Sequence, residues 1–100
     1  MAEQSPLLQV KCDRSGKGWL CRVTVGDDPA ATTHEVVVPD EHLSRLAPDS
    51  SVHALVEESF RFLLEREPRE SILSRFALPV IERYFPAYAA DIGRRLQEKT

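Results

Sequence analysis

Residues 51–66, SVHALVEESFRFLLER, carry the strongest helical pattern in the chain and decide the expected fold. Apolar side chains recur there at three- and four-residue spacing, which is the period of one face of an α-helix. Residues 49–51 offer short side-chain oxygens that can accept the unpaired amide protons of a first turn. Pro68 prevents continuation because it lacks an amide proton. Phe62 and Leu64 widen the apolar stripe, so we expect this helix to have neighbours on two sides.

The N-terminal part of the chain has the alternating pattern of β-strands. Residues 8–12 and 19–25 each place an apolar side chain at every second position, and residues 15–18, SGKG, give a tight-turn signal between them. Centring the turn on Gly16 and Lys17 predicts a hairpin in which every inner apolar residue faces another. The predicted pairs are Leu8 with Val25, Val10 with Val23, and Cys12 with Cys21.

A third strand is predicted over residues 34–38, HEVVV, which end at Pro39. We expect it to lie antiparallel to the second strand, which gives a three-stranded meander in chain order with residues 7–13 and 34–38 as free edges. The predicted pairs are Val36 with Val23, Val38 with Cys21, and His34 with Val25.

Prolines divide the rest of the chain into short helices. A first short helix is expected after Asp40, and Pro68, Pro79 and Pro86 each suit the first position of a further helix. The expected fold is therefore α+β: an N-terminal three-stranded antiparallel β-meander packed on the central helix, followed by short proline-started helices. We expect one domain, with residues 1–6 as a disordered tail, 7–38 as the meander and 40–97 as the helical part. Its large core side chains should be Trp19, Phe60, Phe62, Phe76, Ile81, Tyr84 and Phe85.

Composition indicates a soluble protein of ordinary type. The 100 residues are 42% hydrophobic and 29% charged, with a net charge of −3, which disfavours a nucleic-acid partner. No apolar run approaches the roughly 20 residues of a membrane span, and the N-terminus lacks the basic and apolar parts of a signal peptide. The excess of Arg over Lys and the abundance of Ala are typical of a GC-rich bacterial genome. A cytoplasmic bacterial protein is expected, with no membrane partner.

Cys12 and Cys21 should face each other across the hairpin. The favoured interpretation is a pair of reduced, buried thiols; a cross-strand disulfide with a redox role and a pair of metal ligands are the alternatives. A structural zinc site uses closely spaced Cys or His pairs, and the spacing of these two residues supplies none. No metal and no cofactor are therefore expected.

The three histidines, His34, His42 and His53, show no coordinating spacing and are expected at the surface. The sequence has no P-loop, no glycine-rich dinucleotide motif and no nucleophile elbow. We therefore expect no catalytic residues and no enzyme activity.

Two places could meet a protein partner. The outer face of the predicted sheet presents apolar side chains among polar ones, and the charge-dense run at residues 65–70, EREPRE, could form the rim of a groove or a solvated corner between helices. The candidate partner-binding residues are Leu20, Arg22, Glu35, Val37, Arg66 and Arg69. We predict a small cytosolic interaction or accessory domain without catalytic activity, which binds a protein partner or forms a homodimer.

The segments HEVVVPDEHLSRL and SVHALVEESFRFLLERE resemble a ribbon-helix-helix module over residues 33–66. This resemblance implies the alternative function, a DNA-binding transcriptional regulator or antitoxin that is an obligate dimer. The chain departs from the pattern because the connection to Ser51 is short, and because Glu35 and Val37 stand on the strand face that would read bases.

The whole chain, especially SFRFLLEREPRESIL and VIERYFPAY, also resembles a family of short uncharacterised bacterial proteins of about this length. That resemblance implies no particular activity.

Overall fold

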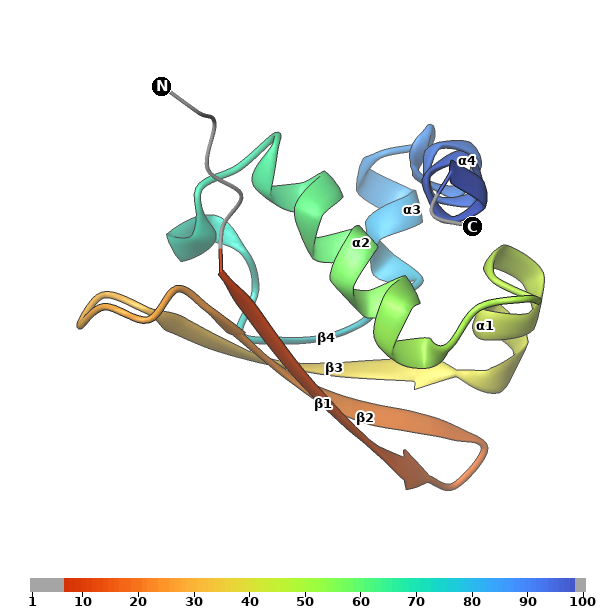
Figure 1. The fold of residues 1–100 in the computed structure, drawn as a ribbon, viewed down its shortest axis with the longest axis horizontal. Coiled ribbons are helices and arrows are strands. Elements are labelled where there is room, and N and C mark those ends of the chain that lie inside the picture. The colour runs from red at the N-terminus through yellow and green to blue at the C-terminus, as the bar shows by residue number, and fades with distance from the viewer. Residues whose placement is uncertain (1–6, 99–100) are drawn as a thin grey trace.

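The computed structural model describes residues 7–98, so the tail predicted for residues 1–6 lies outside the described residues. The fold is α+β: a four-stranded mixed sheet carries all the described helices on one of its faces (Figure 1). The elements are β1 (Leu8–Ser15), β2 (Gly18–Val25), β3 (Thr32–Pro39), α1 (Asp40–Leu46), α2 (Val52–Leu64), the 3-10 turn η1 (Arg69–Ser71), β4 (Arg75–Ala77), α3 (Val80–Tyr84) and α4 (Tyr88–Glu98).

The predicted hairpin of β1 and β2 is confirmed together with its register. The turn consists of Gly16 and Lys17, and Gly16 has a φ of 58°, a conformation that glycine adopts without steric cost. The register places apolar side chains opposite one another on the face that α2 covers. The inner pairs are Leu8 with Val25, Val10 with Val23, and Cys12 with Cys21.

The predicted register of the third strand is wrong by two residues. Val36 lies opposite Cys21 rather than Val23, and His34 lies opposite Val23 rather than Val25. The strand begins earlier than expected, with Thr32 opposite Val25. A slip of two residues keeps every side chain on its predicted face, so the alternating pattern alone could not detect it.

The prediction that β3 forms a free edge of the sheet is wrong. The short strand β4 pairs with β3 in parallel, and two backbone bonds frame the pairing: Glu35 N–H to Ser74 O at 2.8 Å and Leu78 N–H to Val37 O at 2.8 Å. A parallel strand needs a crossover connection, which α1 and α2 supply. The strand takes the place of the helix predicted after Pro68, of which only the single turn η1 forms.

The remaining helices follow the sequence signals more closely. Ser51 caps α2 by accepting the Ala54 amide proton at 3.0 Å, and α2 ends at Leu64, two residues before the predicted end. Pro79 stands directly before α3, whereas α4 begins two residues after Pro86.

The core lies between the sheet and the helices. Phe60, Phe62 and Ile81 are buried as predicted, but Tyr84 is 71% exposed, which makes that prediction wrong. Tyr84 is the last residue of a five-residue helix, too short to bury both of its ends. Tyr88, in α4, is the fully buried tyrosine instead. The other predicted core residues, Trp19, Phe76 and Phe85, are half-buried against the core.

Candidate functional site

The outer face of the sheet is free of helices, because all of those described pack on the opposite face (Figure 1). Leu20 and Val37 are direct cross-strand partners there and are 41% and 44% exposed. Beside them Arg22 lies 3.7 Å from the Glu35 carboxylate, which also binds Arg75 at 3.0 Å. The structure therefore brings four of the six predicted partner-binding residues together, as a small apolar pair flanked by ion pairs.

Arg66 lies apart from that surface, at the end of α2. Its guanidinium carbon is 3.6 Å from the centroid of the Phe62 ring, and it donates a hydrogen bond to the Phe62 carbonyl at 2.9 Å. A cation over an aromatic face is attracted by the ring quadrupole. These contacts give Arg66 a role in covering the core.

Arg69 fastens η1 to the loop between β2 and β3. It donates hydrogen bonds to the Asp28 carboxylate at 3.1 Å and to the Val25 carbonyl at 3.4 Å. Its side chain is only 22% exposed, so most of its surface is already used within the domain.

An apolar groove of about 370 Å³ opens between the end of α2, residues 71–76 and α3. Leu73 and Tyr84 stand at this groove and are 54% and 71% exposed. Glu67 is the acidic residue among those that line it. The other apolar lining residues are Leu63, Ile72, Phe76, Val80, Ile81 and Phe85.

The groove was not predicted from the sequence, because Ile72, Leu73 and Phe76 were expected to lie on one helix. In the structure these residues follow a 3-10 turn and enter a strand, so Ile72 is buried while Leu73 faces outward. A single periodic pattern cannot span such a change of structure, so no signal in the sequence could locate the groove.

His34 is buried, which makes the prediction of a surface position wrong. Its Nδ1 lies 2.8 Å from the Leu73 carbonyl and its Nε2 lies 2.9 Å from the Thr32 hydroxyl. A carbonyl can only accept, so Nδ1 donates and Nε2 accepts the hydroxyl proton. Both ring nitrogens are thus occupied: Nδ1 links β3 to the segment before β4, and Nε2 bonds within β3.

His42 is also buried, again against the prediction, whereas His53 is exposed as expected. The His42 ring lies parallel to the Tyr88 ring, with centroids 6.2 Å apart. Burial is the main cause that lowers the pKa of His42, and the positive charge of Arg45 lowers it further. Arg45 is held by Glu82 at 2.9 Å. Neither buried histidine lines the apolar groove, so the groove contains no imidazole for acid–base chemistry.

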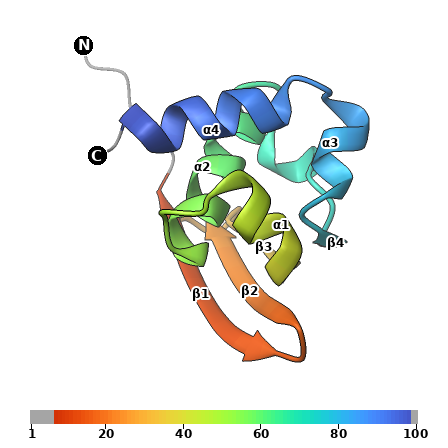
Figure 2. The same ribbon diagram turned by 90° about the vertical axis from the view of Figure 1, so that its right-hand side faces the viewer.

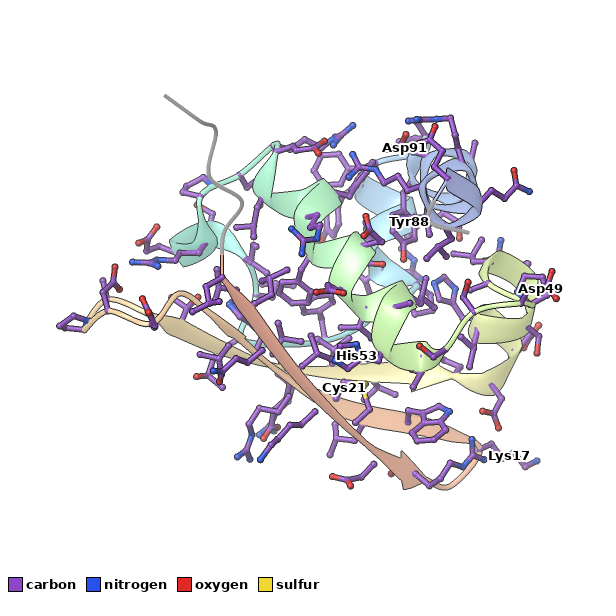
Figure 3. All side chains as sticks on the ribbon, viewed as in Figure 1. Lys17, Cys21, Asp49, His53, Tyr88 and Asp91 are labelled. Atoms are coloured by element: carbon purple, nitrogen blue, oxygen red, sulfur yellow. A yellow bond between two sulfur atoms is a disulfide. The ribbon has the colours of Figure 1, made fainter. Side chains whose placement is uncertain are left out.

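Cys12 and Cys21 form a disulfide, which makes the prediction of two free thiols wrong. Their Cα atoms are 4.0 Å apart, consistent with the close, non-hydrogen-bonded type of antiparallel pair. Figure 3 shows Cys21 on the sheet beneath α2. Within residues 7–98, no group of three or more His, Cys, Asp or Glu side chains is arranged to hold a metal ion.

None of the helices between residues 7 and 98 is long and apolar enough to cross a membrane. Comparisons with protein-family models, curated proteins and solved structures found no match to this chain.

Proposed function

We propose that the chain is a small protein-interaction domain that receives an apolar side chain of a partner in the apolar groove and carries out no catalysis. The observation that carries this proposal is the exposure of Leu73 and Tyr84 beside an apolar hollow of about 370 Å³. That volume falls at the lower end of the range of binding pockets. Covering each large apolar side chain would contribute roughly 1.5–3 kcal/mol.

The charge at the groove suggests which partner fits. Glu67 is the acidic residue among those that line the groove, and it forms no ion pair within the described part of the chain. A partner segment with a leucine or phenylalanine followed by a lysine or arginine would fill the hollow and meet this carboxylate. Electrostatic complementarity of this kind fixes the orientation of a bound segment.

The groove is favoured over the outer sheet face for a physical reason. Leu20 and Val37 form a flat pair, and the charged side chains next to them already bind one another. A flat pair offers no hollow in which an anchoring side chain can be fully desolvated, and such anchors dominate binding energies. The outer face therefore provides a matched control surface.

Partner capture with three tagged proteins tests the proposal: the wild type, Leu73→Asp and Leu20→Asp. Both substitutions place one carboxylate at an exposed leucine, so circular dichroism should show a retained fold. We expect the wild type and Leu20→Asp to capture the same partner protein. Leu73→Asp should no longer capture it. The proposal is wrong if Leu73→Asp retains every partner, or if only Leu20→Asp loses one.

The DNA-binding alternative is less well supported by the arrangement of strands. A ribbon-helix-helix dimer pairs one strand from each copy, and in this domain β3 has β2 on one side and β4 on the other. Light scattering with a short duplex at low salt tests this alternative, since a regulator would shift to a larger mass that added salt reverses.

We further propose the bacterial cytoplasm as the location, as the sequence indicates. Disulfides in cytosolic proteins are usually transient, so the Cys12–Cys21 disulfide should open to two thiols in growing cells and close again on oxidation. Acid quenching of cells, followed by alkylation and mass spectrometry, tests this. Finding the disulfide already formed would place the protein in an oxidising compartment.

A further inference from the structure

Strand β1 has an unpaired edge. It is the terminal strand of the sheet and pairs only with β2 among the described strands. The Gly26 amide donates to the Leu7 carbonyl at 2.8 Å, so the odd-numbered residues of β1 direct their backbone groups toward β2. In an antiparallel pair these groups alternate in direction along a strand. The backbone groups that point away belong to Leu8, Val10, Cys12 and Arg14.

We propose that this edge pairs antiparallel with β1 of a second copy of the chain, about a two-fold axis that passes by Cys12. The two four-stranded sheets would then join into one continuous sheet. Val10 would lie opposite Arg14 of the second copy, and Cys12 opposite its own counterpart. The two-fold axis forms the Val10–Arg14 pair twice and the Cys12–Cys12 pair once. Each of these three pairs exchanges two hydrogen bonds, which gives about six hydrogen bonds in all.

The charges on the outer face of β1 support this register. Lys11 and Asp13 are exposed and take part in no ion pair within the described residues. Within its own sheet Lys11 lies opposite Arg22, a like charge, while Asp13 lies opposite Leu20. With the axis at Cys12, Lys11 faces Asp13 of the second copy, and symmetry forms the same pair twice.

Other two-fold registers lack this complementarity. An axis at Lys11 would place Lys11 opposite Lys11 of the second copy, and an axis at Asp13 would place Asp13 opposite Asp13. An axis at Val10 would place Lys11 opposite Gln9. Like charges directly opposite each other destabilise a pair of strands. A lysine on an edge strand ordinarily discourages pairing. Here the acidic residue two positions later on the same face makes the edge self-complementary in one register.

The helical layers leave room for this arrangement. Leu8 and Val10 pack against the core, whereas residues 13–17 are exposed, and Figure 2 shows the hairpin turn projecting away from the helices. With the axis at Cys12, the two Leu8 residues stand eight positions apart along the joined strands, about 27 Å. The part of α2 that lies beside Leu8, with Glu57, Arg61 and Leu64, would therefore be well separated from its counterpart in the second copy.

Charge reversal tests both the pairing and the register. Light scattering at increasing concentration should show a dimer for the wild type, and Lys11→Asp or Asp13→Lys alone should weaken it by about tenfold or more. The double variant Lys11→Asp/Asp13→Lys should restore the dimer, and so should an equal mixture of the two single variants. A wild type that remains monomeric, or single variants that dimerise as well as the wild type, would overturn the inference.

Crosslinking provides a second test at Cys12. In Cys21→Ser, the free Cys12 should meet its own counterpart at a Cα separation of about 5.5 Å, and mild oxidation should give a covalent dimer. The control Cys12→Ser leaves only Cys21, which is fully buried, and should give no covalent dimer. Adding Lys11→Asp to Cys21→Ser should suppress the crosslink, with thermal unfolding confirming that the variant is folded. Equal crosslinking of both cysteine variants would contradict the register. The groove proposal does not depend on this edge and is tested separately.

Discussion

The hydroxyl groups of Ser59 and Tyr88 lie 2.7 Å apart in the interior, where α2 and α4 pack against each other. Both residues are fully buried. Burial raises the pKa of the Tyr88 phenol far above its ordinary value, so this hydrogen bond joins two neutral groups at any physiological pH. It is a buried polar link between the two helices.

Replacing Tyr88 with phenylalanine should therefore destabilise the domain by about 1–3 kcal/mol, because the Ser59 hydroxyl would remain buried without its partner. Urea unfolding monitored by circular dichroism gives the free energy of unfolding for comparison with the wild type.

The matched control removes both hydroxyls. The double variant Ser59→Ala/Tyr88→Phe should be less destabilised than the sum of the two single variants, because no polar group is then left unpaired. Strict additivity of the three measurements would mean that the two hydroxyls do not interact.

His42 makes stability depend on pH. Its folded-state pKa lies below its unfolded value, so between these two values the unfolded chain binds more protons. The stability that neutral, buried His42 contributes to the free energy of unfolding is therefore fully present above about pH 6.5. It is lost as the pH falls toward the pKa of His42 in the folded state. The wild type should have a smaller free energy of unfolding at about pH 5.5 than at about pH 7.5, as measured by urea titration.

Two variants assign this loss to His42. His42→Leu should reduce the difference between the two pH values, since the titrating ring is gone. His53→Gln, a change at an exposed histidine of α2, should preserve it. If the two variants respond alike, the dependence arises elsewhere, and the groups next to His42, which are Arg45 and Glu82, would be examined next.

Reducing the Cys12–Cys21 disulfide should cost about 2–3 kcal/mol of stability, because the bond closes a short loop with a sequence separation of 9. Thermal unfolding with and without a thiol reductant measures this cost. Cys12→Ser/Cys21→Ser should be insensitive to the reductant. A wild type whose melting temperature does not change on reduction would show that the bond adds no stability.

Residue patterns were most reliable where one local rule was sufficient. The hairpin register followed from the alternation of apolar residues with the turn at Gly16 and Lys17, and the start of α2 followed from Ser51. Each of these features depends on residues close in sequence. The cysteine pair shows the limit of this reasoning, since its position was predicted correctly but its oxidation was not.

Long-range pairing could not be predicted in the same way. Strand β4 has only three residues, and it becomes a strand because β3 offers backbone groups at its open edge. That dependence lies in the tertiary structure and not in the pattern around Phe76. The same cause hid the apolar groove, since Leu73 is exposed only because the chain turns toward β4 after η1.

The loop between β2 and β3 depends on Gly26. This residue has a φ of 94°, where side chains are strained, and a Cβ atom there would come within 2.2 Å of the Arg69 guanidinium. Gly26→Ala should therefore destabilise the domain by about 1–3 kcal/mol through backbone strain, with a further loss if Arg69 is displaced from Asp28. Urea unfolding measures the change.

Gly93 provides the matched control for this last prediction. It lies within α4, and a Cβ atom added there would meet nothing within 4 Å. Gly93→Ala should stabilise the domain by about 0.5–1 kcal/mol, because alanine loses less conformational freedom than glycine in a helix. The two glycine-to-alanine changes are thus chemically identical but expected to be opposite in sign. Equal effects at both positions would contradict the conformation assigned to Gly26, and with it the contact that fastens η1 to the loop.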